Sequence, residues 1–390
     1  MVAIYLSCYL FLVNACSQAV GEVASCWVQH PNAAKRLLLK MARNMDMSDS
    51  KELGVEVGSV ENALQAQASV QIDKVTRLEV RFEAPGVESK RLYANGRMQV
   101  KVWVFVEAQD ADGNAVSLPY FPDLVSARLI EYHTGKPLQQ DVYTGRPLQG
   151  WNSSHVENKY SHEVPGWGLS SLVSDRLSAF RQAPLVFWVS SSVVGQTQVA
   201  VEVTVQGKVY RSNNTTNPGG TKINNSVVLH AEKKATYAVE QFRWESELLK
   251  VGDAFNSFSL YHLGLYLGSR QVELFSWESA RYNPDNRYPI EFCRVRPNSL
   301  AWAIKYFTGV LPSATQKSVR VNLPGGQYDI EVHKRSGELS LVNGFSSRLG
   351  GNFQTRNEVF PFTVIDEYGN DHALSIEIDE HNLKFNLRRG

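Results

Sequence analysis

The stretch that decides the fold runs from Met98 to Leu118 and reads MQVKVWVFVEAQDADGNAVSL. Apolar side chains occupy every second position from Met98 to Val106, and Trp103 and Phe105 lie on the face between them. Such alternation predicts a β-strand, because successive side chains of a strand point to opposite faces. The strand is therefore expected to be apolar on one face and aromatic on the other.

A tight turn follows this strand. Residues 110–114, Asp-Ala-Asp-Gly-Asn, tolerate positive φ, and the alternation resumes at Val116, which predicts a hairpin. The same order recurs near the C-terminus, where residues 366–370, Asp-Glu-Tyr-Gly-Asn, separate the alternating residues 362–364 and 374–378. The sequence predicts that one hairpin design is used twice.

These D-x-x-G-N turns between alternating apolar residues resemble hairpins of bacterial immunoglobulin-like β-sandwich modules. The resemblance implies a sandwich-type fold. It also implies a setting outside the cell or on the surface of a particle, where such modules are frequent.

Further strands are indicated on both sides of a charged break at Glu232-Lys-Lys234. Leu300 to Phe307 has helical spacing, so a short helix competes with a strand there. The polar residues from Asn213 to Asn225 predict an exposed loop tip. We expect an all-β chain with at most short helices, made of two antiparallel β-sandwich-like domains, residues 45–232 and 233–390, which meet between Leu229 and Gln241. The remaining expected strands are 76–82, 124–132, 185–190, 198–205, 209–210, 227–229, 258–267, 272–277, 328–332 and 339–341.

Residues 1–44 differ in composition from the rest. Met1 to Val13 is an apolar run of signal-peptide length, and Leu12 to Cys16 resembles a lipoprotein box. Met45 and Met47 open a stretch typical of the start of a soluble protein. The segment is thus a leader, a lipoprotein signal or an overextended start. A leader implies an extracellular, cell-surface or particle-associated protein, and a start at Met45 or Met47 implies a cytoplasmic location before release.

Composition and motifs limit the function. The 40 basic and 39 acidic residues leave a net charge of +1, which gives no general attraction to nucleic acid. Three of the four cysteines precede residue 27, so no disulfide framework is expected in the body. No P-loop, dinucleotide, zinc-protease or nucleophile-elbow motif is present. Asp110 and Asp112 lack the further ligands of a calcium loop. We predict no catalytic residues, no cofactor and no metal.

One segment, residues 151–168, is polar, aromatic and without regular periodicity, as many binding loops are. Aromatic residues there need either a partner or a packing site on the sheet. Glu157 and Glu163 are the acids that a sugar hydrolase would use in this segment. The predicted binding residues are Trp151, His155, Tyr160, His162 and Trp167.

We therefore favour a non-enzymatic β-sandwich protein, secreted or part of a phage or tail-like particle, that binds a protein or carbohydrate surface or packs against copies of itself. A carbohydrate-active hydrolase with an aromatic sugar-binding face is the enzymatic alternative. A third class is a β-rich secreted toxin or effector. A membrane is an expected partner only for a lipoprotein or a toxin.

Overall fold

The computed structural model describes residues 72–84, 86–116, 125–140, 148–165, 184–279, 290–295, 306–347, 359–379 and 384–390. The segment 1–44, Trp167 and most of the Leu300–Phe307 stretch lie outside these residues. Residues 71–390 form one compact unit. Among the described residues, strands before residue 233 pair only with one another, and strands after residue 241 pair only with one another. We call residues 71–232 the first half and 233–390 the second half; the domain boundary itself stays a prediction.

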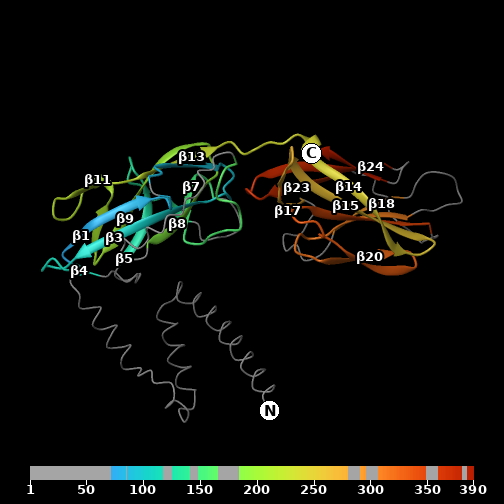
Figure 1. The fold of residues 1–390 in the computed structure, drawn as a ribbon, viewed down its shortest axis with the longest axis horizontal. Helices are drawn as coiled ribbons and strands as arrows, with labels where there is room; N and C mark the ends of the chain where they lie inside the picture. Colours follow the sequence, from blue (N-terminus) through green and yellow to red (C-terminus); the bar gives the residue numbers. More distant parts are fainter. Residues whose placement is uncertain are drawn as a thin grey trace, which may run out of the picture. The chain divides into compact units, whose positions relative to one another are not determined.

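The described residues of the first half form two sheets and a small hairpin (Figure 1). One sheet orders its strands as β1 (Lys74–Arg81), β3 (Val100–Gln109), β8 (Leu185–Ser191), β7 (Trp151–Ser154) and β6 (Gln139–Gln140), with β4 (Ala115–Val116) beside β3. The other orders β10 (Lys208–Arg211), β9 (Gly195–Val205), β13 (Val227–Glu232) and β2 (Ser89–Tyr93), with β5 (Val125–Glu131) paired to β9. The hairpin joins β11 (Asn213–Thr216) to β12 (Lys222–Asn224).

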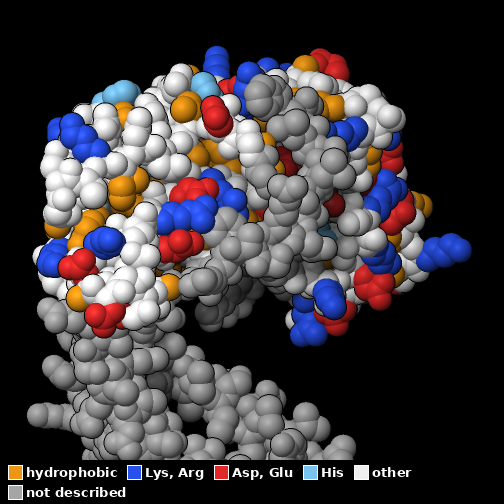
Figure 2. Space-filling model, turned by 60° about the vertical axis from the view of Figure 1, so that its left-hand side comes forward, with side chains coloured by type: hydrophobic (Ala, Val, Ile, Leu, Met, Phe, Trp, Pro, Cys, Tyr) orange, Lys and Arg blue, Asp and Glu red, His pale blue; other side chains and the backbone are white. Residues whose placement is uncertain are grey.

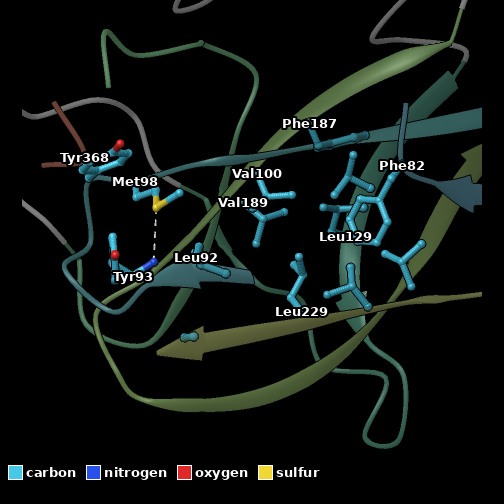
Figure 3. Packing of buried hydrophobic residues seen from close by; sticks show 14 of the residues in the cluster. Phe82, Leu92, Tyr93, Met98, Val100, Leu129, Phe187, Val189, Leu229 and Tyr368 are labelled. Atoms are coloured by element: carbon cyan, nitrogen blue, oxygen red, sulfur yellow. Dashed lines mark hydrogen bonds between the residues drawn. The ribbon is translucent and has the colours of Figure 1, made fainter. Parts of the chain in front are cut away.

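Side chains of both sheets meet in the main hydrophobic cluster. Val100 of β3 and Val189 of β8 face Leu129 of β5 and Leu229 of β13, and all four are fully buried (Figure 3). On the other face of β3, Trp103 and Phe105 are also buried, and their rings meet edge to face. The predicted strand with one aliphatic and one aromatic face is confirmed, and both of its faces are covered.

The second half contains two sheets and a hairpin. One sheet orders β14 (Phe242–Gly252), β15 (Asn256–Leu267), β22 (Leu339–Ser346), β19 (Tyr306–Leu311) and β18 (Ile290–Val295), with β16 (Arg270–Val272) beside β15. The other orders β17 (Leu274–Glu278), β23 (Phe360–Asp366), β24 (Asp371–Asp379) and β25 (Lys384–Arg389). The hairpin joins β20 (Ser318–Leu323) to β21 (Gly326–Glu331).

The central sheet of the second half is covered on both faces. Leu263 and Leu341 belong to the main cluster together with residues of β23 and β24. Phe258 and Val342 belong to a separate cluster with side chains of the β20–β21 hairpin. Because the side chains of a strand alternate between faces, β15 and β22 contribute to both clusters.

The two predicted hairpin turns have the same hydrogen bonds. In the first, Asp110 Oδ1 accepts the N–H groups of Asp112 at 3.0 Å and Asn114 at 2.8 Å. In the second, Asp366 Oδ1 accepts those of Tyr368 at 2.9 Å and Asn370 at 2.8 Å. The glycine of each turn has a left-handed φ, +83° at Gly113 and +79° at Gly369. The prediction of one hairpin design used twice is confirmed at the level of individual bonds.

The expected all-β fold is confirmed; the described part contains one short 3-10 helix, η2 (Val239–Gln241). The predicted exposed tip is confirmed for most of residues 213–225, but the segment is a hairpin of β11 and β12 and not a loop throughout. Asn217 holds the chain where the tip begins by accepting from Arg211 N and donating to Arg211 O. Trp151 begins strand β7 and does not lie in a loop. Tyr306 and Phe307 begin strand β19, so the helical alternative does not hold for them.

Candidate ligand-binding site

The predicted binding residues do not form one cluster. Trp151 is half-buried and packs against the main hydrophobic cluster. The ring of His155 lies 4.4 Å from that of Phe187, and its Nδ1 lies 3.1 Å from the carbonyl oxygen of Val186. These two residues are held against the sheet of the first half that contains β7 and β8.

His162 is fixed at both ring nitrogens. Its Nδ1 lies 3.1 Å from the carbonyl oxygen of Gln99, and its Nε2 lies 2.9 Å from Glu157 Oε1. The ring also lies 4.4 Å from that of Trp188. His162 and Glu157 therefore anchor the segment on the sheet.

Tyr160 contacts the second half. Its ring stacks on Phe275 at 6.0 Å between centroids, and the N–H of the next residue, Ser161, donates to Glu367 O at 2.7 Å. These contacts give each described aromatic residue of the segment a packing partner. Trp167 lies outside the described residues, and a binding role for the segment stays a prediction.

The second D-x-x-G-N turn is docked beside this segment. Asn95 Nδ2 donates to Tyr368 O and to Asn370 Oδ1, both at 2.9 Å, and Arg97 Nη1 donates to Gly369 O at 3.1 Å. Figure 3 shows Tyr368 beside Tyr93 and Met98 of the first half, and the two tyrosine rings meet edge to face at 6.0 Å. We call the contact of residues 366–371 with the first half the turn joint.

A separate cavity of about 420 Å³ lies in the first half, along the outer edge of β1. Much of its polar lining comes from the run Asn224-Asn225-Ser226, which directly precedes β13. Its walls are formed by Glu79, Val80, Arg81, Ala84, Gly86, Val87, Glu88, Gln198, Asn224, Asn225, Ser226, Val227 and Val228. We call this the β1 cavity.

The neutral polar groups of the β1 cavity are fixed by hydrogen bonds. Gln198 Nε2 donates to Ser226 Oγ at 2.7 Å, and Asn224 Oδ1 accepts from the hydroxyl of Tyr132 at 2.7 Å. Asn225 Oδ1 accepts from the backbone N–H of Val80. Each of the three amides thus uses one end to hold its position. No hydrogen bond within the described residues is seen for the other ends, Gln198 Oε1 and the Nδ2 groups of Asn224 and Asn225.

Two of the three charged side chains that line the cavity contact other protein groups. Glu79 accepts from Arg77, which also lies 3.3 Å from Glu107 Oε1. The guanidinium of Arg81 lies over the ring of Phe105, 4.4 Å from its centroid. Figure 2 shows basic and acidic side chains next to each other on the face that it presents. The cavity has two carboxylates against one guanidinium and does not form a basic patch.

The described residues contain no group of three or more His, Cys, Asp or Glu side chains that could hold a metal ion. In the same residues, no helix has the length and apolar character needed to cross a membrane. The sequence did not single out the β1 cavity. Its residues come from three separate stretches, and only the polar run before β13 gave a local signal.

No protein-family model matches the chain, and no curated protein matches it. Among solved structures, the chain is similar to the C-terminal domain of the Streptococcus pyogenes antigen I/II-family protein AspA, with 10% identity and a TM-score of 0.17, over 76% of this chain and 96% of that one. It is also similar to the structure named BspA_C_WT, with 12% identity and a TM-score of 0.13, over 48% of this chain and 60% of that one. A third, BspA_C_mut, has 9% identity and a TM-score of 0.15, over 73% and 96%.

Proposed function

We propose that this chain is a non-enzymatic binding protein and that the β1 cavity is its ligand site. The observation that supports the proposal is the set of three amides, Gln198, Asn224 and Asn225, each fixed at one end and open at the other. Binding sites of this kind combine a preformed hollow with a few positioned polar groups. The proposal includes the setting expected from the sequence, outside the cell or on a particle.

Binding without catalysis fits the groups that line the cavity. Acyl transfer needs a nucleophile beside a base, and a metal-assisted reaction needs a ligand set. Ser226 is the one hydroxyl residue of the lining, and its oxygen accepts from the amide of Gln198, which is not a base. The cavity therefore offers hydrogen bonds and no nucleophile paired with a base, and Glu79, one of its two carboxylates, is bonded to Arg77.

The test is a binding screen of the purified chain against immobilised oligosaccharides, peptides and nucleotides. We expect ligands from one class to bind, and the double variant Gln198→Ala/Asn224→Ala to lose that binding while its circular dichroism and melting temperature stay close to wild type. Gln196→Ala is the matched control, because Gln196 lies on the same face of β9 two residues away, is exposed and does not line the cavity. Binding that survives the double variant would place the ligand elsewhere and overturn the proposal.

A further inference from the structure

We infer that the ligand of the β1 cavity is a neutral saccharide. This inference rests on the proposed function and adds the class of ligand. Three features of the cavity support it: the state of the β1 edge, the balance of charge, and the kind of polar group that remains open.

The edge of β1 is blocked where the cavity meets it. A peptide that binds by adding a strand needs a row of unpaired backbone N–H and C=O groups on the edge it joins. The N–H of Val80 points outward from this edge and already donates a hydrogen bond to Asn225 Oδ1. The Asn225 side chain thus occupies the place where a carbonyl group of an added strand would bind. This disfavours an extended peptide as the ligand.

The charge of the cavity disfavours an anionic ligand. Nucleotides and sulfated or phosphorylated ligands are held by cations that face them directly. The single basic residue of the lining, Arg81, lies with its guanidinium over Phe105, and two carboxylates, Glu79 and Glu88, share the same walls. A phosphate or sulfate group would therefore enter a site of net negative formal charge.

The open polar groups match hydroxyls. The two open amide nitrogens donate, Gln198 Oε1 accepts, and the hydroxyl hydrogen of Ser226 is free to donate because its oxygen is the acceptor for Gln198. A sugar hydroxyl both donates and accepts, so neighbouring hydroxyls of one ring can use donors and acceptors together. Val87 and Val228, both half-buried, give apolar contact for the C–H groups of the ring.

The experiment is titration of the full chain with neutral oligosaccharides, with sulfated or sialylated forms of the same oligosaccharides, and with extended peptides, each at low and high salt. We expect neutral oligosaccharides to bind with little dependence on salt. Gln198→Ala and Asn224→Ala should each weaken this binding about fivefold to tenfold, as expected for the loss of one hydrogen bond. Gln196→Ala should leave it unchanged, because Gln196 is exposed and does not line the cavity.

The outcomes separate this inference from the proposed function. If peptides or acidic saccharides bind through the cavity residues and neutral saccharides do not, the ligand class is wrong and the proposed binding function stands. If no ligand of any class responds to Gln198→Ala or Asn224→Ala, both the inference and the proposed function fail. If neutral saccharides bind equally to wild type and to both variants, the saccharide site lies outside the cavity and the inference is overturned.

Discussion

Val102 lies at the centre of the first half, fully buried on the aliphatic face of β3. We predict that Val102→Asp unfolds this half, because an unpaired buried carboxylate costs several kcal/mol out of the roughly 5–15 kcal/mol that stabilise a typical domain. Val209→Asp is the control, because that valine of β10 is 41% exposed. Thermal unfolding followed by circular dichroism measures both. A soluble Val102→Asp protein with the melting temperature of wild type would mean that the sheet face is assigned wrongly.

Asp371, which directly follows the second D-x-x-G-N turn, gives the fold a dependence on pH. Burial opposes its ionisation, but the ammonium group of Lys234, 2.8 Å away, a backbone N–H and the guanidinium of Arg97 together outweigh burial and hold the pKa of the Asp371 carboxyl below its usual range. A carboxyl whose pKa is lowered by folding adds stability above its unfolded pKa of about 3.9, and this stability is lost as the pH falls through the folded value. The side chain is 40% exposed, so the contribution is at most about 1 kcal/mol.

We therefore predict that Asp371→Asn lowers the urea midpoint at about pH 7 and that this difference is smaller at about pH 3, which lies below the unfolded pKa, because the stability is lost as the pH falls towards and through the lowered folded pKa. Asp112→Asn, at an exposed aspartate in the first hairpin turn, serves as the control for loss of a surface charge. A difference between wild type and Asp371→Asn that is equally large at both pH values would show that the ion pair with Lys234 does not stabilise the fold.

The two D-x-x-G-N turns can be compared directly, because the first is open to solvent and the second packs against the first half. A Cβ added at Gly113 would meet nothing within 4 Å, whereas one added at Gly369 would lie 2.7 Å from Arg97 Cβ. Both positions have a left-handed φ, which costs a non-glycine residue about 1–2 kcal/mol. We predict that Gly113→Ala costs about this much and that Gly369→Ala costs clearly more, because Arg97 must also move. Urea unfolding of both variants measures the difference, and equal costs would contradict docking of the second turn.

The sequence predicted the elements whose side chains alternate strictly. Both hairpins and β9 belong to this group, since one buried face imposes a period of two. Strand β14 was not predicted, because residues 245–248 are all exposed and show no apolar alternation. The pairing of Phe242 to Leu249 with β15 determines this strand, and pairing between distant residues leaves no local pattern. The parallel pairing of β13 with β2 is equally invisible in the sequence.

The candidate site was beyond sequence reasoning for a related reason. The aromatic residues of segment 151–168 attracted attention because such residues are frequent in interfaces, but Tyr160 stacks on Phe275, more than a hundred residues away in the chain. The amides of the β1 cavity are ordinary polar residues until β1, β9 and the run before β13 bring them together. Tertiary contacts thus determine which polar groups are used for packing and which stay open.

At the scale of the whole molecule, the two halves are joined by the chain from Lys233 to Ala238, by the turn joint and by the stacking of Tyr160 on Phe275. No strand pair of the described residues joins the halves, and the turn joint contains the hydrogen bonds of Asn95 and Arg97 and that of Ser161 N–H to Glu367 O. Lys233 is exposed, so trypsin has a site between the halves, and the turn joint limits how often this link opens. We predict that limited trypsin digestion cuts the wild-type chain in the window from Leu229 to Gln241 and leaves two stable fragments.

The double variant Asn95→Ala/Arg97→Ala should speed this cleavage severalfold, because the link opens more often once the second turn is no longer held. The hydrophobic clusters should stay intact, since both side chains lie outside them. The first half should melt somewhat earlier, because Asn95 Oδ1 also accepts from the N–H groups of Arg97 and Met98. Asp112→Asn, at an exposed aspartate in the first hairpin turn, should be cut at the wild-type rate. Mass spectrometry of the digest identifies the ends of the fragments. Cuts confined to residues 213–225, with no stable fragment ending between Leu229 and Gln241, would show that the boundary lies elsewhere. An unchanged cleavage rate in the double variant would show that the turn joint does not hold the halves together.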